Sequence, residues 1–450
     1  MGAMTTQDAA NVEKLVGALG TAIDQPAYVC VRELLRFCAT NRAELDGILR
    51  SAAGLARRKL RSTLAAVANE KLSSELFDLM DIGILQAEVR RHSRSHSPVL
   101  VAQALADAID EAVGARFLGS MPEEMTVGPG DAFFVARPPI KQLFAAELNG
   151  NPDSYEAPTD ATPRLRLLDR AYRYELRFSR KLAGALPTLG PSARIGFVLP
   201  NSGLSEFKVP DEPADRFFGV VPREEDRQLA LITCAINWAT ENRLPLVLLP
   251  ELSLSEAILT ELKRRYKAAV ESSSLPLLVA GSVHAVSNGE KRNRCTLLAP
   301  GGLSAEHDKL EPFIVKGRIE EICVGRHVTV HTSNEWSTVT LICKDFLPEA
   351  MLELLVRAAP SSVLVPAMSP TTDVFDANAR HLATHVQAVV AVANATDVLD
   401  QATMYLGRPL RQDPIHLHGR IDTKHPVMIV AYVSTPPTHE QCLEVRLTDA

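Results

Sequence analysis

Three side chains of types that act together in covalent catalysis occur in the second half of the chain. Glu251 directly follows the apolar run 244–250, Cys343 follows the apolar run 338–342, and Lys309 lies between them in sequence. A carboxylate, an ammonium and a thiol are the groups that acyl transfer through a covalent intermediate needs. The thiol would attack a carbonyl or nitrile carbon, the carboxylate would take its proton and later activate water, and the ammonium would stabilise the developing negative charge.

These groups need a rigid frame, and the sequence from Ala193 onward predicts one. Short apolar stretches of strand length alternate there with amphipathic segments of helical period. Near-continuous apolar strands are typical of a sheet buried on both faces, and catalytic groups in such α/β folds lie where strands end. The expected strands are 195–199, 244–249, 275–280, 338–342, 362–365, 389–393 and 427–432, and the expected helices are 224–240, 255–270 and one that begins at Pro348.

The first 120 residues have a different character, rich in Ala, Leu and Arg. Apolar residues recur there at helical spacing, as in the segment with Val31, Leu34, Leu35 and Cys38 on one face. Fourteen Lys and Arg residues balance fourteen Asp and Glu residues, which argues against a partner surface driven by charge. We therefore expect a helical N-terminal domain over residues 1–120.

A connector is expected between these two regions. Turn-forming Gly, Pro and Asn residues are frequent between positions 120 and 163, and the run 164–182 then places apolar residues at helical spacing. The predicted domains are a helical N-terminal domain over 1–120, a connector with a helix over 121–191, and an α/β domain over 192–450.

From about residue 193 to residue 435, the sequence resembles the nitrilase superfamily of carbon–nitrogen hydrolases, which use a Glu-Lys-Cys triad in that chain order. The resemblance implies that Glu251 is the general base, Lys309 the ammonium that stabilises the oxyanion, and Cys343 the nucleophile. The segments that carry it are Leu246-Val-Leu-Leu-Pro-Glu-Leu252, Glu306-His-Asp-Lys-Leu-Glu-Pro312 and Leu341-Ile-Cys-Lys-Asp-Phe-Leu-Pro-Glu349, with support from Val279-Ala-Gly-Ser282 and Asn293-Arg-Cys-Thr-Leu-Leu298.

The resemblance also suggests supporting residues around the triad. The family often has a second glutamate that positions the lysine, and either Glu320 or Glu321 could fill that place. Asp345 is a further candidate, since it follows the cysteine by two residues. Lys344 stands where the family commonly has an aromatic or small residue, and a cation beside the thiol would lower the thiol pKa if it points inward.

The same resemblance implies an αββα sandwich, with two packed sheets between helix layers, and a homodimer or higher homo-oligomer. It implies hydrolysis of a non-peptide amide or related C–N bond through a thioester. The substrate would be a small amide-like molecule, and no metal or organic cofactor would be needed. An acceptor other than water would make the protein an amidotransferase or acyltransferase. The alternative is a non-catalytic scaffold or small-molecule sensor whose N-terminal helices bind partners.

Composition argues against several other classes. The chain has 450 residues, a formal net charge of -6 and a pI near 6.1, so it lacks the basic surface of nucleic-acid binders. No apolar run approaches the roughly 20 residues of a membrane helix, and the first residues do not resemble a signal peptide. Seven cysteines without CxxC spacing indicate reduced thiols. We therefore expect a cytoplasmic protein with no membrane or nucleic-acid partner.

Two further clusters favour structural interpretations over functional ones. His381 and His385 share a helical face at positions i and i+4, but no third ligand is suggested, so packing or hydrogen bonding is favoured over a metal site. The basic run 90–96 is better explained as a solvated helix end than as an anion site.

Overall fold

The computed structural model divides into two compact units, one of residues 5–135 with 164–171 and the other of residue 136 with 172–447. No helix among the described residues is both long and apolar enough to cross a membrane. Residues 137–163, a large part of the expected connector, lie outside the described residues. The structure describes residues 5–50, 54–72, 76–136, 164–190, 192–201, 203–210, 215–270, 274–370, 373–395, 403–407, 416–417, 426–433 and 443–447.

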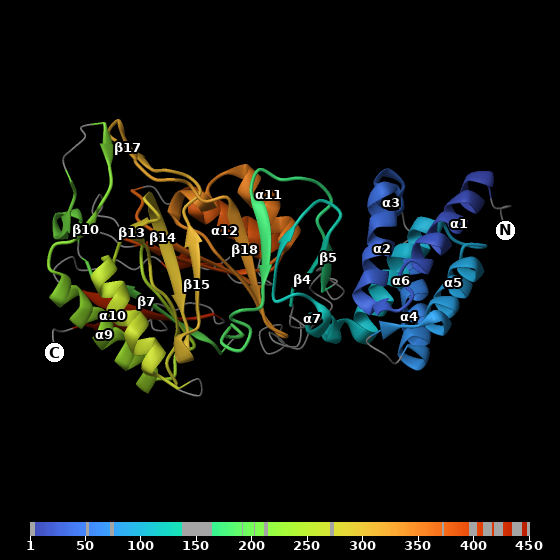
Figure 1. Cartoon of the computed structure of the whole chain (residues 1–450), viewed down its shortest axis with the longest axis horizontal. Coiled ribbons are helices and arrows are strands. Elements are labelled where there is room, and N and C mark those ends of the chain that lie inside the picture. Colours follow the sequence, from blue (N-terminus) through green and yellow to red (C-terminus); the bar gives the residue numbers. More distant parts are fainter. Residues whose placement is uncertain are drawn as a thin grey trace. The chain divides into compact units, whose positions relative to one another are not determined.

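The N-terminal unit is mainly helical because its apolar residues recur at helical spacing (Figure 1). Helix α6 is central: its apolar side chains are almost all buried, and helices α1 to α5 all contact it. The expected face of α2 is buried at Val31, Leu34 and Cys38. The helices are α1 (Thr6–Gly20), α2 (Ala27–Thr40), α3 (Arg42–Arg50), α4 (Gly54–Lys71), α5 (Leu79–His92), α6 (Pro98–Val113) and α7 (Phe117–Ser120).

Short strands also belong to this unit, so it is not entirely helical. Two-residue strands cannot show a periodic sequence pattern, which is why β1 and β2 were not expected. Buried Asp110 of α6 accepts hydrogen bonds from the backbone N–H groups of Arg164 (2.9 Å) and Leu165 (3.1 Å), which attaches β5 to the helices. The strands are β1 (Gln25–Pro26), paired with β2 (Leu76–Phe77), β3 (Glu124–Val127), and β4 (Ala132–Phe134), paired with β5 (Leu165–Leu167).

The prediction of a helix over 164–182 is wrong, because this segment contains the strands β5 and β6 (Glu175–Ser179) instead. Apolar spacing over 164–182 fitted a helix, but in β6 the buried Leu176 and Phe178 alternate with the exposed Glu175 and Arg177. This two-residue period is that of a strand with one buried face. Parallel pairing of β6 with β18 (His327–Thr332), which comes much later in the chain, supplies the tertiary contact that decides between the two patterns.

The second unit is a mixed α/β structure, which confirms the α/β class expected for this half of the chain. Its first sheet has the strand order β13-β14-β12-β11-β7-β24-β25, with β15 also paired to β14. Central strands β7, β11 and β12 are parallel, so their carboxyl ends meet at one edge. The strands are β7 (Arg194–Leu199), β11 (Leu246–Leu248), β12 (Leu277–Val279), β13 (Val283–Ser287), β14 (Glu290–Leu298), β15 (Ser304–Asp308), β24 (Val427–Tyr432) and β25 (Leu443–Arg446).

Helices α9 (Glu225–Glu241) and α10 (Glu256–Ala268) pack on this first sheet (Figure 1). Ile232 of α9 and Ile258 of α10 join Val247 of β11 in one buried apolar cluster. Each such side chain contributes roughly 1.5–3 kcal/mol on burial. The helix layer therefore fixes β11, and with it the position at which Glu251 leaves the sheet.

The second sheet has the order β23-β22-β21-β20-β19-β18-β6 within this unit. Helix α11 (Glu349–Ala358) has Pro348 as its N-cap residue, close to the expected start, and contacts α12 (Asp373–His385), which packs on β21 and β22. The sheet strands are β18 (His327–Thr332), β19 (Ser337–Thr340), β20 (Ser362–Ala367), β21 (Val389–Asn394), β22 (Thr403–Gly407) and β23 (His416–Leu417); smaller sheets contain β8 (Phe207–Lys208) with β10 (Val221–Pro222), and β16 (Ile314–Val315), β17 (Arg318–Glu320) and β9 (Arg216–Phe217).

We predict that Gly281→Ala destabilises the protein more than Gly289→Ala does. Gly281 has φ +56°, and a Cβ atom there would overlap the Pro250 carbonyl oxygen and the Ser253 Oγ atom, which border Glu251. Gly289 has φ +79° with open space around it, so its variant carries only the backbone cost of about 1 kcal/mol. Urea unfolding should give a loss of at least about 2 kcal/mol for Gly281→Ala.

Equal losses in the two glycine variants would contradict this account. They would mean that the close approach of the Pro250 carbonyl adds nothing to the ordinary cost of a left-handed backbone at Gly281.

Candidate active site

The three residues singled out from the sequence meet in one buried cluster. Glu251 follows β11, Lys309 follows β15, and Cys343 begins the short turn Cys343–Phe346 after β19. The Lys309 Nζ atom donates to Glu251 Oε1 at 2.6 Å, and the thiol of Cys343 is hydrogen-bonded to Glu251. All three side chains are nearly inaccessible, with exposures of 3% for Glu251 and 1% for Lys309 and Cys343.

Asp345 joins the turn that carries the thiol to the loop that carries the ammonium. Its Oδ2 atom accepts from the Ile342 N–H at 3.2 Å, and its Oδ1 atom accepts from the Leu310 and Glu311 N–H groups, both at 2.9 Å. Cys343 has φ +46°, a left-handed conformation that costs a non-glycine residue about 1–2 kcal/mol. The Asp345 carboxylate holds the turn in this strained form and so acts as a structural support.

Of the two glutamates left open by the sequence, only Glu320 lies in the cluster. Its Oε2 atom accepts from Lys309 Nζ at 2.7 Å, and Glu320 is only 2% exposed. Glu321 points elsewhere and accepts from Lys291 Nζ at 2.5 Å. Adjacent residues on an extended segment point to opposite sides, which explains why only one of the two reaches the lysine.

Two residues of the β13–β14 hairpin complete the network and were not predicted as site residues. Asn293 Nδ2 donates to Glu251 Oε1 at 3.0 Å and to Glu320 Oε1 at 2.7 Å, and His284 Nε2 lies 3.0 Å from Glu320 Oε1. The hairpin register places His284 directly opposite Asn293. The signal that could have identified them is the Asn288-Gly289 turn, which sets this register.

The electrostatics distinguish the two carboxylates that flank Lys309. Burial raises the pKa of Glu251, and the nearby charge of Glu320 raises it further against the opposing effect of Lys309. Burial also acts to raise the pKa of Glu320, but Lys309 and His284 outweigh it and lower that pKa. Burial would lower the pKa of Lys309, yet the two carboxylates reverse this and raise it. Lys309 and Glu320 are therefore charged, and Glu251 is the group suited to exchange a proton.

The thiol of Cys343 is protonated at rest. Burial raises its pKa well above the usual value, and the charge of Glu251 raises it further. Lys309 and a hydrogen bond from the Met368 backbone N–H lower the pKa, but by less. Because the thiolate is the nucleophilic form, attack by this sulfur requires a base, and Glu251 is hydrogen-bonded to it.

Lys344 does not activate the thiol. Its Nζ atom donates to the Pro312 carbonyl oxygen at 3.0 Å, and the charges that act on the thiol pKa are those of Glu251 and Lys309. The inward cation considered from the sequence is therefore Lys309, while Lys344 ties the cysteine turn to the lysine loop.

An apolar wall adjoins these polar groups and limits their contact with water. Phe313 places its ring centroid 5.8 Å from Lys309 Nζ, Leu252 follows Glu251, and Met368 donates its N–H to the thiol. Low dielectric surroundings strengthen the electrostatic interactions inside the site. The wall consists of Phe207, Phe217, Val220, Leu252, Phe313 and Met368.

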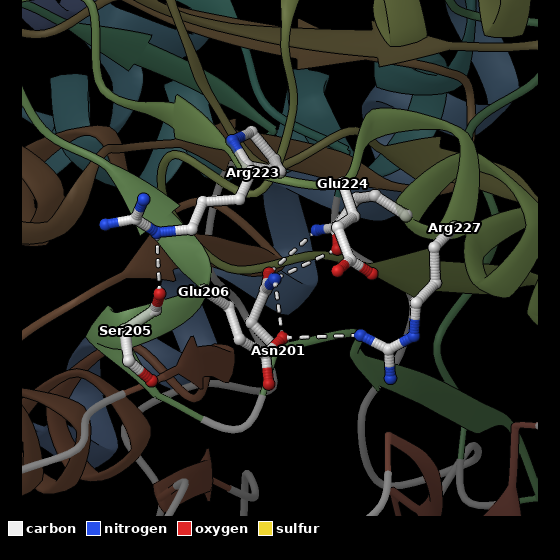
Figure 2. A pocket seen from close by; sticks show the side chains of 8 residues that line it. Asn201, Ser205, Glu206, Arg223, Glu224 and Arg227 are labelled. Atoms are coloured by element: carbon white, nitrogen blue, oxygen red, sulfur yellow. Dashed lines mark hydrogen bonds and ion pairs between the residues drawn. The ribbon is translucent and has the colours of Figure 1, made fainter.

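A polar hollow of about 170 Å³ lies where β7 ends and α9 begins (Figure 2). Buried Gln228 exchanges two hydrogen bonds with Asn201, at 2.7 and 2.9 Å, and donates from Nε2 to the Ser253 carbonyl oxygen at 2.8 Å. Arg227 lies 3.8 Å from a carboxylate oxygen of Glu206 across the hollow. Gln228 therefore supports the loop that follows Glu251, and charges in the hollow are balanced by its own lining.

The two histidines of α12 are stacked rather than splayed around an ion. The ring centroids of His381 and His385 are 3.9 Å apart, and His385 Nδ1 lies 2.9 Å from the His381 carbonyl oxygen. In the run 90–96, Arg90 lies 3.6 Å from Glu13, and Arg91 lies 3.4 Å from Glu88. Both clusters thus have local partners.

Solved structures of a nitrilase-superfamily amidase are similar to part of this chain, while no protein-family model and no curated protein matches its sequence. An amidase from Nesterenkonia sp. is 17% identical, with a TM-score of 0.41, over 55% of this chain and 94% of that chain. A cysteine-to-serine mutant of the Nesterenkonia AN1 amidase is also 17% identical, with a TM-score of 0.41, over 56% of this chain and 94% of that chain. A glutamate-to-leucine mutant of the same amidase is 17% identical, with a TM-score of 0.40, over 55% of this chain and 93% of that chain. That structure shows covalent addition of the acetamide moiety of fluoroacetamide at its active-site cysteine.

We predict that two variants shift the titration of the Cys343 thiol in opposite directions. Glu251→Gln removes a negative charge that raises the thiol pKa, so the pKa falls and the thiolate forms at lower pH. Lys309→Met removes a positive charge that lowers the thiol pKa, so the pKa rises. The rate of Cys343 alkylation by iodoacetamide, followed across pH by peptide mass spectrometry, measures both shifts.

Cys295 is the internal control for this experiment. It is buried, and burial alone raises its pKa, so its alkylation should be the same in both variants. Shifts of the same sign at Cys343 in the two variants would contradict the electrostatic assignment.

Proposed function

We propose that this protein is a nitrilase-like, cysteine-dependent hydrolase that cleaves a non-peptide C–N bond of a small amide or related compound. The observation that carries the proposal is the hydrogen-bonded series from Cys343 through Glu251 to Lys309 in one buried site. Its groups correspond in type and chain order to those that the sequence resemblance implies. The fold of the second unit supplies the strand ends at which they meet.

In the first half of the proposed reaction, the Cys343 sulfur forms a bond to the substrate carbonyl carbon while its proton passes to Glu251. The carbonyl π electrons move to oxygen, and Lys309 donates a hydrogen bond to the resulting oxyanion. As the C=O bond re-forms, the C–N bond breaks and the proton on Glu251 passes to the departing nitrogen. Ammonia or an amine leaves, and a thioester remains on Cys343.

In the second half, Glu251 takes a proton from water as the water oxygen attacks the thioester carbon. Lys309 again stabilises the oxyanion, and the carbon–sulfur bond breaks. The sulfur regains a proton from Glu251, and the carboxylic acid is released. Each group thus ends in its starting state.

The energetics of the cluster also favour function over stability. Burying an ammonium and two carboxylates costs several kcal/mol per ion, and well-packed apolar residues would often serve stability equally well. Lys309, Glu251 and Glu320 are nevertheless all at least 97% buried. Perturbed, converging ionisable groups of this kind mark a functional site.

The alternative is a non-catalytic scaffold or small-molecule sensor. One observation favours it: the thiol of Cys343 is 1% exposed and protonated at rest, next to the apolar wall. A buried cysteine of this kind can serve simply as a small apolar side chain.

Incubation with a panel of small amides and nitriles tests the proposed function. We expect ammonia release and, after acid quenching, an acyl adduct on Cys343 detected by mass spectrometry. Cys343→Ala should lower kcat/KM by at least about a thousandfold, because it removes the covalent route. Cys295→Ala is the matched control and should leave turnover close to that of the unmodified protein.

The scaffold alternative makes the opposite prediction. No ammonia, no adduct, and alkylation of Cys343 no faster than that of Cys295 would reject the hydrolase.

A further inference from the structure

His284 is a completely buried side chain whose two ring nitrogens have different fixed partners. The backbone N–H of Val220 donates to Nδ1 at 3.1 Å, and Nε2 lies 3.0 Å from Glu320 Oε1. A ring nitrogen that accepts a hydrogen bond carries no proton, so the hydrogen of the neutral ring is on Nε2. His284 therefore donates from Nε2 to Glu320. A second proton, on Nδ1, would face the Val220 N–H, so two donors would meet.

The carboxylate of Glu320 receives hydrogen bonds at both of its oxygens. Oε2 accepts from Lys309 Nζ at 2.7 Å and from the Phe313 N–H at 2.8 Å. Oε1 accepts from Asn293 Nδ2 at 2.7 Å and from His284 at 3.0 Å. These four hydrogen bonds disfavour protonation of the Glu320 carboxylate, because a protonated carboxyl group would be a donor at one oxygen and would face another donor there.

Glu251 is bound differently from its partner. Its Oε1 atom accepts from Lys309 Nζ at 2.6 Å and from Asn293 Nδ2 at 3.0 Å, and among the described residues its other side-chain partner is the thiol of Cys343. Two carboxylates beside one ammonium repel each other, so any proton the pair takes up goes to the one with fewer donors. That carboxylate is Glu251.

We propose that His284 is a positioning residue that keeps Glu320 a fixed anion and so reserves proton transfer for Glu251. This inference rests on the proposed function. Of the donors to Glu320, Lys309 and Asn293 also contact Glu251 and therefore favour both carboxylates, whereas His284 and the Phe313 N–H contact Glu320 alone. His284 is thus the one side chain among these donors that distinguishes the two.

The surroundings of His284 restrict how the ring can move. Its ring stacks on Phe218 at a centroid distance of 4.6 Å and lies near Phe217 at 6.4 Å. Among the described residues, Glu320 is the charged group in contact with the ring, and Lys291 Nζ lies 5.4 Å from the centroid of Phe218. The aromatic contacts hold the ring in the plane that its two hydrogen bonds require.

Two substitutions separate the two hydrogen bonds of the imidazole. In His284→Gln, the side-chain amide nitrogen takes the place of Nε2, so the donor to Glu320 is kept. In His284→Asn, the amide oxygen takes the place of Nδ1, so the acceptor for Val220 is kept and the donor to Glu320 is lost. A structural role for His284 would affect both variants similarly.

The kinetic readout is the division of the effect between kcat and KM. His284→Asn should lower kcat roughly tenfold with little change in KM, as expected for the loss of one hydrogen bond to a charged group. His284→Gln should stay within about threefold of the unmodified protein. Equal losses of kcat in both variants, or a loss confined to KM, would overturn the positioning role.

A second readout does not need turnover. Nitrogen-15 NMR of histidine-labelled protein, with the His284 signals identified by their loss in His284→Gln, reports the protonation of each ring nitrogen. A hydrogen on Nε2 together with an Nδ1 that carries none, in the buffer used for the kinetics, supports the proposal. A cationic ring, or a hydrogen on Nδ1, would refute it. If no amide is turned over, the proposed hydrolase fails, while this measurement still decides the state of His284.

Discussion

The ammonium of Lys309 is the constraint on which the arrangement of the second unit depends. A buried cation is tolerated only with anionic partners and satisfied hydrogen bonds, and Lys309 has Glu251 at 2.6 Å and Glu320 at 2.7 Å. The second carboxylate then needs its own donors, which Asn293, His284 and the Phe313 backbone provide. These partners lie on several different strands and loops, so the burial of one charge requires these segments to meet at one place.

The two large sheets contribute to this cluster through their strand ends. Glu251 follows β11 of the first sheet, and its backbone N–H donates to the Ala367 carbonyl oxygen of β20 at 3.4 Å. Cys343 follows β19 of the second sheet, and the Asp345 carboxylate accepts hydrogen bonds from the loop that carries Lys309. Backbone and carboxylate contacts thus run in both directions between the sheets. The geometry of the site therefore depends on how the two sheets are aligned as well as on its own side chains.

A long apolar run precedes Glu251 and Cys343 in the sequence and makes the two strand ends visible, and the structure brings both residues together with Lys309. The sequence does not separate Glu320 from Glu321, since β17 has three residues and no measurable period. The Asn288-Gly289 turn indicates the register that pairs His284 with Asn293, but the contact of His284 with Val220 joins distant segments, and no linear pattern contains it. The false helix over 164–182 has the same cause, because a distant strand determines the conformation of β6.

The left-handed backbone of Cys343, with φ +46°, also limits what this position can become over evolutionary time. Valine, isoleucine and threonine are strongly disfavoured there, because a branched Cβ clashes with the neighbouring carbonyl in that conformation. Glycine and asparagine fit with the least strain. Homologues that lack the cysteine but retain this turn should therefore have one of a few residue types at this position. An alignment of such sequences would show mainly glycine and asparagine there.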